Sequence, residues 1–149
     1  SRESHLLDTG GAIVAALPLL GTAPFLLLNG DIWTDYPLER LIENGLGNNF
    51  DAHLVLVENP SHNSTGDFLL SRRKVKLLNS DISSGNTFAG LSVWRPEVFA
   101  NFEIENAAFP LKNILSQSIK LERVTGELYM GDWCDIGDLK RYKQLLTQM

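Results

Sequence analysis

Two aspartates have the surroundings expected of metal ligands, and Asp31 is the clearer of them. It follows the apolar run Phe25-Leu26-Leu27-Leu28, from which only Asn29-Gly30 separates it. In open α/β sheets ligands bind beyond the carboxyl ends of the strands, so an acid at this position is placed to meet a ligand. Carboxylate oxygens suit Mg²⁺, which prefers oxygen donors. The alternative is a plain turn in which Asp31 accepts backbone hydrogen bonds.

The second aspartate is Asp135, which lies in the turn-rich stretch 131–137 beside Trp133. Asp138 is the natural N-cap of a helix that begins at Leu139, so capping does not explain Asp135. A carboxylate next to an aromatic side chain suits a loop that lines a pocket. A surface turn is the alternative interpretation.

A third candidate is Thr9-Gly10-Gly11, which precedes an apolar helix. Glycines let a ligand approach the backbone, and a helix N-terminus favours anions, so this segment could be a loop that approaches a nucleotide. The alternative is a simple helix-entry turn, because the spacing matches neither a Walker loop nor a dinucleotide fingerprint.

Other reactive groups form no recognisable site. His5, His53 and His62 show no metal-ligand spacing, and His53 is predicted to be structural because it opens a strand. No Gly-x-Ser-x-Gly nucleophile motif is present. The basic run at 72–76 is most simply a solvated hairpin face.

The elements that must position the two aspartates form an α/β pattern. The apolar runs 25–28 and 52–57 predict strands buried on both faces, as in a parallel sheet. A helix that starts near Pro37 separates them, so a right-handed crossover is the default expectation. The remaining predicted elements are helices at 12–20, 96–99, 111–119 and 139–146, an antiparallel pair at 67–71 and 74–78, and strands at 87–94 and 123–130.

Composition limits the partners of the protein. The 149 residues fit one domain, and 13 Lys+Arg against 18 Asp+Glu give a net charge of -5, which disfavours nucleic acid and acidic membrane surfaces. Any phosphate must therefore be bound locally by backbone amides, a metal ion or a few placed cations. The apolar stretch 12–28 is interrupted by prolines and glycines and is too short to span a membrane. The single cysteine, Cys134, indicates a reducing compartment, and we expect the cytoplasm.

Taken in order, several segments resemble the sugar-1-phosphate nucleotidyltransferases. They are 6–12, 24–33, 66–68, 88–90 and 129–137, and they include Asn29-Gly30-Asp31 and Trp133-Cys134-Asp135-Ile136-Gly137. The resemblance implies that Asp31 and Asp135 are the catalytic pair that binds Mg²⁺. It also implies nucleotide contacts by Thr9, Gly10, Gly11 and Asn29, with Glu3 in the same region, and sugar-phosphate contacts by Gly66, Gly90 and Trp133.

The resemblance also implies a fold and a reaction. The fold is a three-layer, Rossmann-like nucleotide-diphospho-sugar transferase domain with a mixed sheet and helices on both faces. In the reaction, a sugar 1-phosphate oxygen attacks the α-phosphorus of a nucleoside triphosphate, and pyrophosphate leaves. The motif order is nearest to that of members that use UTP and N-acetylmuramate 1-phosphate, which implies a role in recycling of cell-wall peptidoglycan.

Two expected motifs are absent from the 149 residues. A Glu-Lys-Pro lysine, which would contact the sugar phosphate, does not occur between Gly66 and Thr87, and the Gly-x-Gly-x-Arg loop that cradles the triphosphate does not occur at all. We therefore expect residues 1–149 to be the C-terminal part of a single nucleotidyltransferase domain that is incomplete at its N-terminus. The expected consequences are an exposed apolar sheet edge near residue 1 and a fragment that is inactive without the missing N-terminal segment.

Two other functions remain open. One is a non-catalytic module that binds a nucleotide sugar or regulates another protein, and it would account for the missing phosphate loop. The other is a metal-dependent glycosyltransferase on a related fold. It is less favoured because Asp31-Ile32-Trp33 lacks the Asp-x-Asp pattern common in such enzymes.

Overall fold

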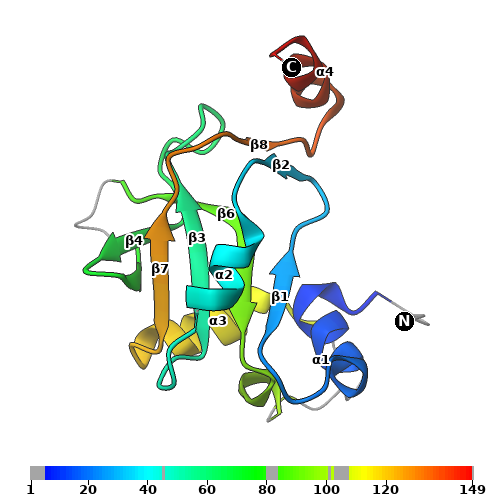
Figure 1. Ribbon diagram of the computed structural model, residues 1–149, viewed down its shortest axis with the longest axis vertical. Helices are drawn as coiled ribbons and strands as arrows, with labels where there is room; N and C mark the ends of the chain where they lie inside the picture. Colours follow the sequence, from blue (N-terminus) through cyan, green and yellow to red (C-terminus); the bar gives the residue numbers. More distant parts are fainter. Residues whose placement is uncertain (1–5, 45, 80–83, 101, 103–107, 149) are drawn as a thin grey trace.

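A six-stranded mixed sheet forms the centre of the computed structural model, which describes residues 6–44, 46–79, 84–100, 102 and 108–148 (Figure 1). The strand order is β1-β6-β3-β7-β5-β4, in which β3 and β7 run parallel and the other neighbours run antiparallel. The bounds are β1 Phe25–Leu28, β3 Ala52–Val57, β4 Phe68–Ser71, β5 Lys74–Leu77, β6 Thr87–Trp94 and β7 Val124–Leu128.

Helices cover both faces of this sheet. One core joins α1 (Asp8–Leu20), the 3₁₀ helix η1 (Pro96–Phe99) and α3 (Leu111–Lys120) to one face, and a second core joins α2 (Leu38–Asn44) to the other. Successive residues of β3 face the two cores alternately, and all six are buried, which explains why 52–57 is apolar without interruption. The predicted three-layer α/β architecture with a mixed sheet is confirmed.

The prediction that β1 is a strand buried in a parallel sheet is wrong. In the part of the chain that the structure describes, β1 is an edge strand that pairs antiparallel with β6, and its side chains are half-buried or exposed. The eight-residue β6 lies between β1 and β3 and pairs with both, so β1 and β3 run in the same direction without being neighbours. The sheet edge expected near residue 1 falls on residues outside the described ranges.

A small second sheet positions the two aspartates. It pairs β2 (Ile32–Thr34) with β8 (Trp133–Asp135) and lies beyond the carboxyl ends of β1, β3 and β7 (Figure 1). The sequence predicts only a turn over 131–137, because its many turn-forming residues conceal a three-residue strand. Such a short strand depends on its partner rather than on its own sequence.

The last helix, α4 (Leu139–Gln148), exposes most of its apolar stripe. Of the four residues on that stripe only Leu145 is buried, and Leu139, Tyr142 and Leu146 are all at least 45% exposed. Figure 1 shows α4 next to the β2–β8 pair and away from the main sheet. In the described part of the chain, no helix is long and apolar enough to cross a membrane.

His53 is buried in β3, and its environment predicts how stability depends on pH. Its Nδ1 lies 2.8 Å from Thr125 Oγ1, and the residue is only 2% exposed. Burial lowers the pKa of His53 to about 4, although the nearby Glu127 carboxylate opposes the shift. Two further charges, those of Arg73 and Arg40, lower it. The imidazole therefore stays neutral in the folded state at a pH where the unfolded chain is protonated.

We expect the free energy of unfolding to fall as the pH drops from about 6.5 towards 4. Over this range His53 binds a proton in the unfolded state but stays neutral in the folded state. Between pH 7.5 and pH 5 this one group should account for about 2 kcal/mol. Urea denaturation at the two pH values measures the change, and His53→Gln should remove that part of it. An unchanged pH dependence in the variant would show that His53 is not its source.

Candidate active site

The pairing of β2 with β8 brings Asp31 and Asp135 together, although they lie far apart in the sequence. Ile32 is directly opposite Asp135, and the amide of Ile136 donates to the carbonyl oxygen of Asp31 at 2.7 Å. The two aspartates are therefore held by adjacent rungs of one antiparallel ladder. The structure supplies the juxtaposition that the sequence spacing could not.

Both carboxylates face the space beside Gly137. A β-carbon on that glycine would lie 3.0 Å from Asp135 Oδ1 and 3.3 Å from Asp31 Oδ2. The Asp31 side chain is exposed and makes no hydrogen bond or ion pair with other residues that the structure describes. Two neighbouring carboxylates, of which Asp31 makes no hydrogen bond or ion pair with the described residues, are suitable ligands for a metal ion.

These donors fit Mg²⁺ better than a metal that needs a full set of protein ligands. Among the described residues, no group of three or more His, Cys, Asp or Glu side chains could enclose a metal ion. Mg²⁺ commonly binds through one or two carboxylates and completes its shell with water and substrate phosphates. Asp31 and Asp135 meet that requirement.

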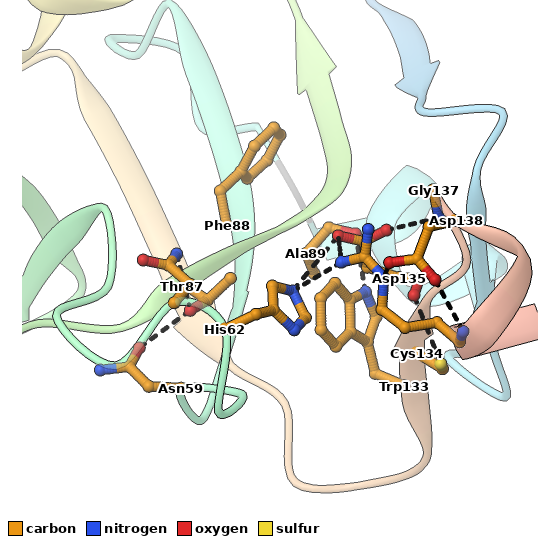
Figure 2. A network of polar contacts seen from close by, with 12 residues as sticks. Asn59, His62, Thr87, Phe88, Ala89, Trp133, Cys134, Asp135, Gly137 and Asp138 are labelled. Atoms are coloured by element: carbon orange, nitrogen blue, oxygen red, sulfur yellow. Dashed lines mark hydrogen bonds and ion pairs between the residues drawn. The ribbon is translucent and has the colours of Figure 1, made fainter. Parts of the chain in front are cut away.

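Two hydrogen bonds orient Asp135. Its Oδ1 accepts the amide of Gly137 at 2.8 Å (Figure 2). Its Oδ2 accepts Nη1 of Arg141 at 2.8 Å. His62 Nε2 lies 3.4 Å from the same Oδ2. The carboxylate is half-buried, so the two hydrogen bonds hold it in one orientation towards the space beside Gly137.

Sequence reasoning missed His62 and Arg141. Arg141 is positioned by the helix cap, because its amide donates to Asp138 Oδ1 at 2.8 Å, and the predicted N-cap is confirmed. That hydrogen bond is the main reason why the pKa of Asp138 lies below its usual range. The spacing of three residues after a cap could have pointed to Arg141. No sequence pattern pointed to His62, because it lies in a polar loop without a recognisable motif.

The loop that carries His62 is tied to the start of β6. Thr87 Oγ1 donates to Asn59 Oδ1 at 2.9 Å (Figure 2). The amide of Phe88 donates to Asp67 Oδ2 at 2.8 Å. These bonds fix both ends of the loop, so His62 has a defined place beside Asp135.

A cavity of about 190 Å³ adjoins the two carboxylates. Trp133 forms part of its wall, held by a hydrogen bond of 2.9 Å from Nε1 to the carbonyl oxygen of Ala89 (Figure 2). Predicted site residues line much of this cavity, namely Asn29, Asp31, Gly90, Trp133 and Asp135.

Gly90 has a structural reason to be glycine. Its φ is 76°, and a β-carbon would lie 2.9 Å from the β-carbon of Asn29, whose amide donates to the Gly90 carbonyl at 2.8 Å. The glycine lets the end of β1 pack against β6 and keeps the cavity open between them. Its predicted contact with the sugar phosphate stays a prediction.

A larger cavity of about 770 Å³ shares Asn29, Asp67 and Phe88 with the first. Its lining includes Thr9 and Gly66, so the two cavities together hold most of the predicted nucleotide and sugar contacts. These binding roles also stay predictions.

Gly10 and Gly11 line neither of these two cavities. The segment expected to be a loop forms the first turn of α1, and both glycines are buried within it. The Gly10 amide donates to the Phe109 carbonyl at 3.0 Å, and a β-carbon would lie 2.7 Å from that oxygen. Their nucleotide contacts stay predictions, and Glu3 lies outside the described residues.

Comparison with known proteins shows what this chain is similar to. No protein-family model matches the chain. It is 40% identical over 143 residues to N-acetylmuramate alpha-1-phosphate uridylyltransferase of Neisseria meningitidis serogroup B, a match that covers 93% of this chain and 60% of the relative. It is 28% identical to the mannose-1-phosphate guanyltransferase of Hypocrea jecorina, over 95% of this chain and 41% of that protein. The chain thus spans less than two thirds of these relatives.

Solved structures show the same fold at low sequence identity. The match to the inositol-1-phosphate CTP transferase of T. maritima covers 99% of this chain and 62% of the transferase chain, with a TM-score of 0.75 and 13% identity. The UTP-bound UGPase of Acinetobacter baumannii also matches 99% of this chain, and 58% of its own, with a TM-score of 0.75 and 14% identity.

Proposed function

Because the chain is related in sequence and fold to the sugar-1-phosphate nucleotidyltransferases, we propose that the intact protein transfers a nucleotidyl group from a nucleoside triphosphate to a sugar 1-phosphate and releases pyrophosphate. The 40% identity to the Neisseria uridylyltransferase favours UTP and N-acetylmuramate 1-phosphate as the substrates. On this proposal the protein acts in the cytoplasm and serves the recycling of cell-wall peptidoglycan.

The observation that carries the proposal is the meeting of Asp31 and Asp135 at the β2–β8 pair. Nucleotidyl transfer needs positioned phosphates and neutralised charge rather than a protein nucleophile. Asp31 and Asp135 would hold Mg²⁺, which when bound supplies charge neutralisation and orientation of the phosphates. Gly90 and Trp133 would wall the sugar pocket, and Asn29 would contact the nucleotide at the junction of the two cavities.

The triphosphate requires a further binding element. The 149 residues contain no Gly-x-Gly-x-Arg sequence, so we propose that they form the later part of one nucleotidyltransferase domain and that the cradle belongs to another segment of the intact protein. In the described residues β1 pairs with β6 alone, and its second edge is available to a further strand.

A substrate screen on the intact protein tests the proposed function. UTP, the other nucleoside triphosphates, N-acetylmuramate 1-phosphate and glucose 1-phosphate are combined in the presence of Mg²⁺, and pyrophosphate is measured. We expect the fastest release with UTP and N-acetylmuramate 1-phosphate. Absence of pyrophosphate with every pair would refute the proposal.

The same assay tests whether residues 1–149 can act without the segment proposed to carry the phosphate cradle. We expect the 149 residues alone to release no pyrophosphate from UTP and N-acetylmuramate 1-phosphate, because the triphosphate has no cradle in them. Robust turnover by this polypeptide would contradict the proposal that the cradle lies elsewhere.

The missing phosphate loop also favours a second candidate, a non-catalytic module that binds a nucleotide sugar. Such a module would bind UDP-sugars in calorimetry without releasing pyrophosphate. The coding sequence upstream of Ser1 discriminates between the two, since an in-frame Gly-x-Gly-x-Arg segment favours the enzyme and a start codon favours the module.

A further inference from the structure

Arg141 borders the same space as the two carboxylates. Its Nη2 would lie 3.1 Å from a β-carbon on Gly137, next to the oxygens of Asp31 and Asp135 that face this point. The Arg141 side chain is partly buried, at 24% exposure, and Nη1 already donates to Asp135 Oδ2. Nη2 donates no hydrogen bond to any residue that the structure describes.

The remaining contacts of Arg141 hold the guanidinium in place. Nη1 lies 2.9 Å from His62 Nε2, and because arginine can only donate, His62 accepts this hydrogen bond. Nε lies 2.9 Å from Asp138 Oδ2 without hydrogen-bond geometry, so that contact is electrostatic. Nη2 therefore faces the space beside Gly137, and the described residues leave its donors unused.

The charge balance of the smaller cavity calls for a cation. Asp31, Asp67 and Asp135 line it, and a divalent metal ion would offset only the charge of Asp31 and Asp135. To bind a phosphate monoester there, the protein must supply a further positive charge besides the metal ion. Among the described residues that line this cavity or contact its carboxylates, only His62 and Arg141 can carry one, and His62 acts as an acceptor towards Arg141.

We propose that Arg141 binds the phosphate of the sugar 1-phosphate through Nη2, and that His62 positions its guanidinium. This inference rests on the proposed function and assigns the cation that the absent Glu-Lys-Pro lysine leaves open. The rival cation is Lys112, an exposed residue that lines the larger cavity. The structure favours Arg141 because it is held next to both carboxylates.

Kinetics of the intact protein at saturating Mg²⁺ test the proposal. Loss of a charged hydrogen bond in Arg141→Ala should raise the KM for N-acetylmuramate 1-phosphate by about 10- to 100-fold, while the KM for UTP changes by less than about 3-fold. In Arg141→Lys the rise in this KM should be smaller than in Arg141→Ala but still present, because lysine keeps the positive charge and lacks the paired N–H donors of the planar guanidinium. Lys143→Ala removes one exposed charge from the same helix and should behave as the wild type.

Calorimetry with N-acetylmuramate 1-phosphate and Mg²⁺ in the absence of nucleotide gives a readout that does not depend on turnover. We expect binding to the wild type and loss of affinity in Arg141→Ala. The inference is overturned if the KM for UTP rises instead, if only the Mg²⁺ requirement changes, or if Lys112→Ala alone weakens sugar-phosphate binding. Failure of the proposed function is distinct, because the wild type would then release no pyrophosphate.

Discussion

Replacement of Asp31 by asparagine is expected to reduce the kcat of the intact protein by at least about 100-fold, the scale of losing a group that stabilises charge in the transition state. The substitution keeps the size of the side chain and removes its negative charge. Because the Asp31 carboxylate is exposed and makes no hydrogen bond or ion pair with the described residues, the free energy of unfolding should change by less than about 0.5 kcal/mol. Pyrophosphate release and urea denaturation measure the two effects.

Asp132→Asn is the matched control. Asp132 lies near Asp135 and is exposed, but its carbonyl oxygen, and not its carboxylate, contributes to the fold by accepting Thr34 Oγ1 at 2.7 Å. The control should keep wild-type activity. Equal losses in the two variants would mean that general negative charge, rather than a ligand at Asp31, is what the site requires.

The second large effect is expected at Gly137. Its φ lies outside the left-handed region, so the backbone accepts alanine without strain. The new methyl group would occupy the space between Asp31, Asp135 and Arg141, at 3.0 to 3.3 Å from their polar atoms. Small displacements of reacting groups can cost about 100-fold in rate, and we expect a loss of this size in Gly137→Ala with little change in stability.

Gly47→Ala serves as the control for Gly137→Ala. Gly47 also lies outside the left-handed region, and a β-carbon there would meet the Phe50 ring at 3.2 Å, at the opposite end of the sheet. Its activity should match that of the wild type. Full activity in Gly137→Ala would show that the space beside this glycine holds no reacting group.

The main sheet was largely predictable because its strands have strong local signals. The uninterrupted run 52–57 and the apolar run 87–94 form β3 and β6 as predicted, and the polar excursion forms the hairpin β4–β5. The position of β1 in the sheet was not predictable from its own residues. An apolar run of four suits both an interior and an edge strand, and the insertion of β6 decides between them.

The residues of the candidate site could be proposed one by one from the sequence, but their arrangement could not. Asp31 and Asp135 were identified by position and by family resemblance, yet only the β2–β8 pairing brings them together. That pairing is non-local and involves strands of three residues, which carry little sequence signal. Arg141 and His62 escaped prediction for a related reason, since their significance lies in their common position beside Asp135.

We propose that Asp31 and Asp135 together form the metal site of the intact protein. The most direct test is a crystal structure of the intact protein with Mn²⁺ in place of Mg²⁺, in which anomalous scattering locates the metal. We predict a peak bonded to an oxygen of each aspartate, at about 2.1 Å. A peak bonded to neither carboxylate, or to one of them only, would show that the two aspartates do not form one metal site.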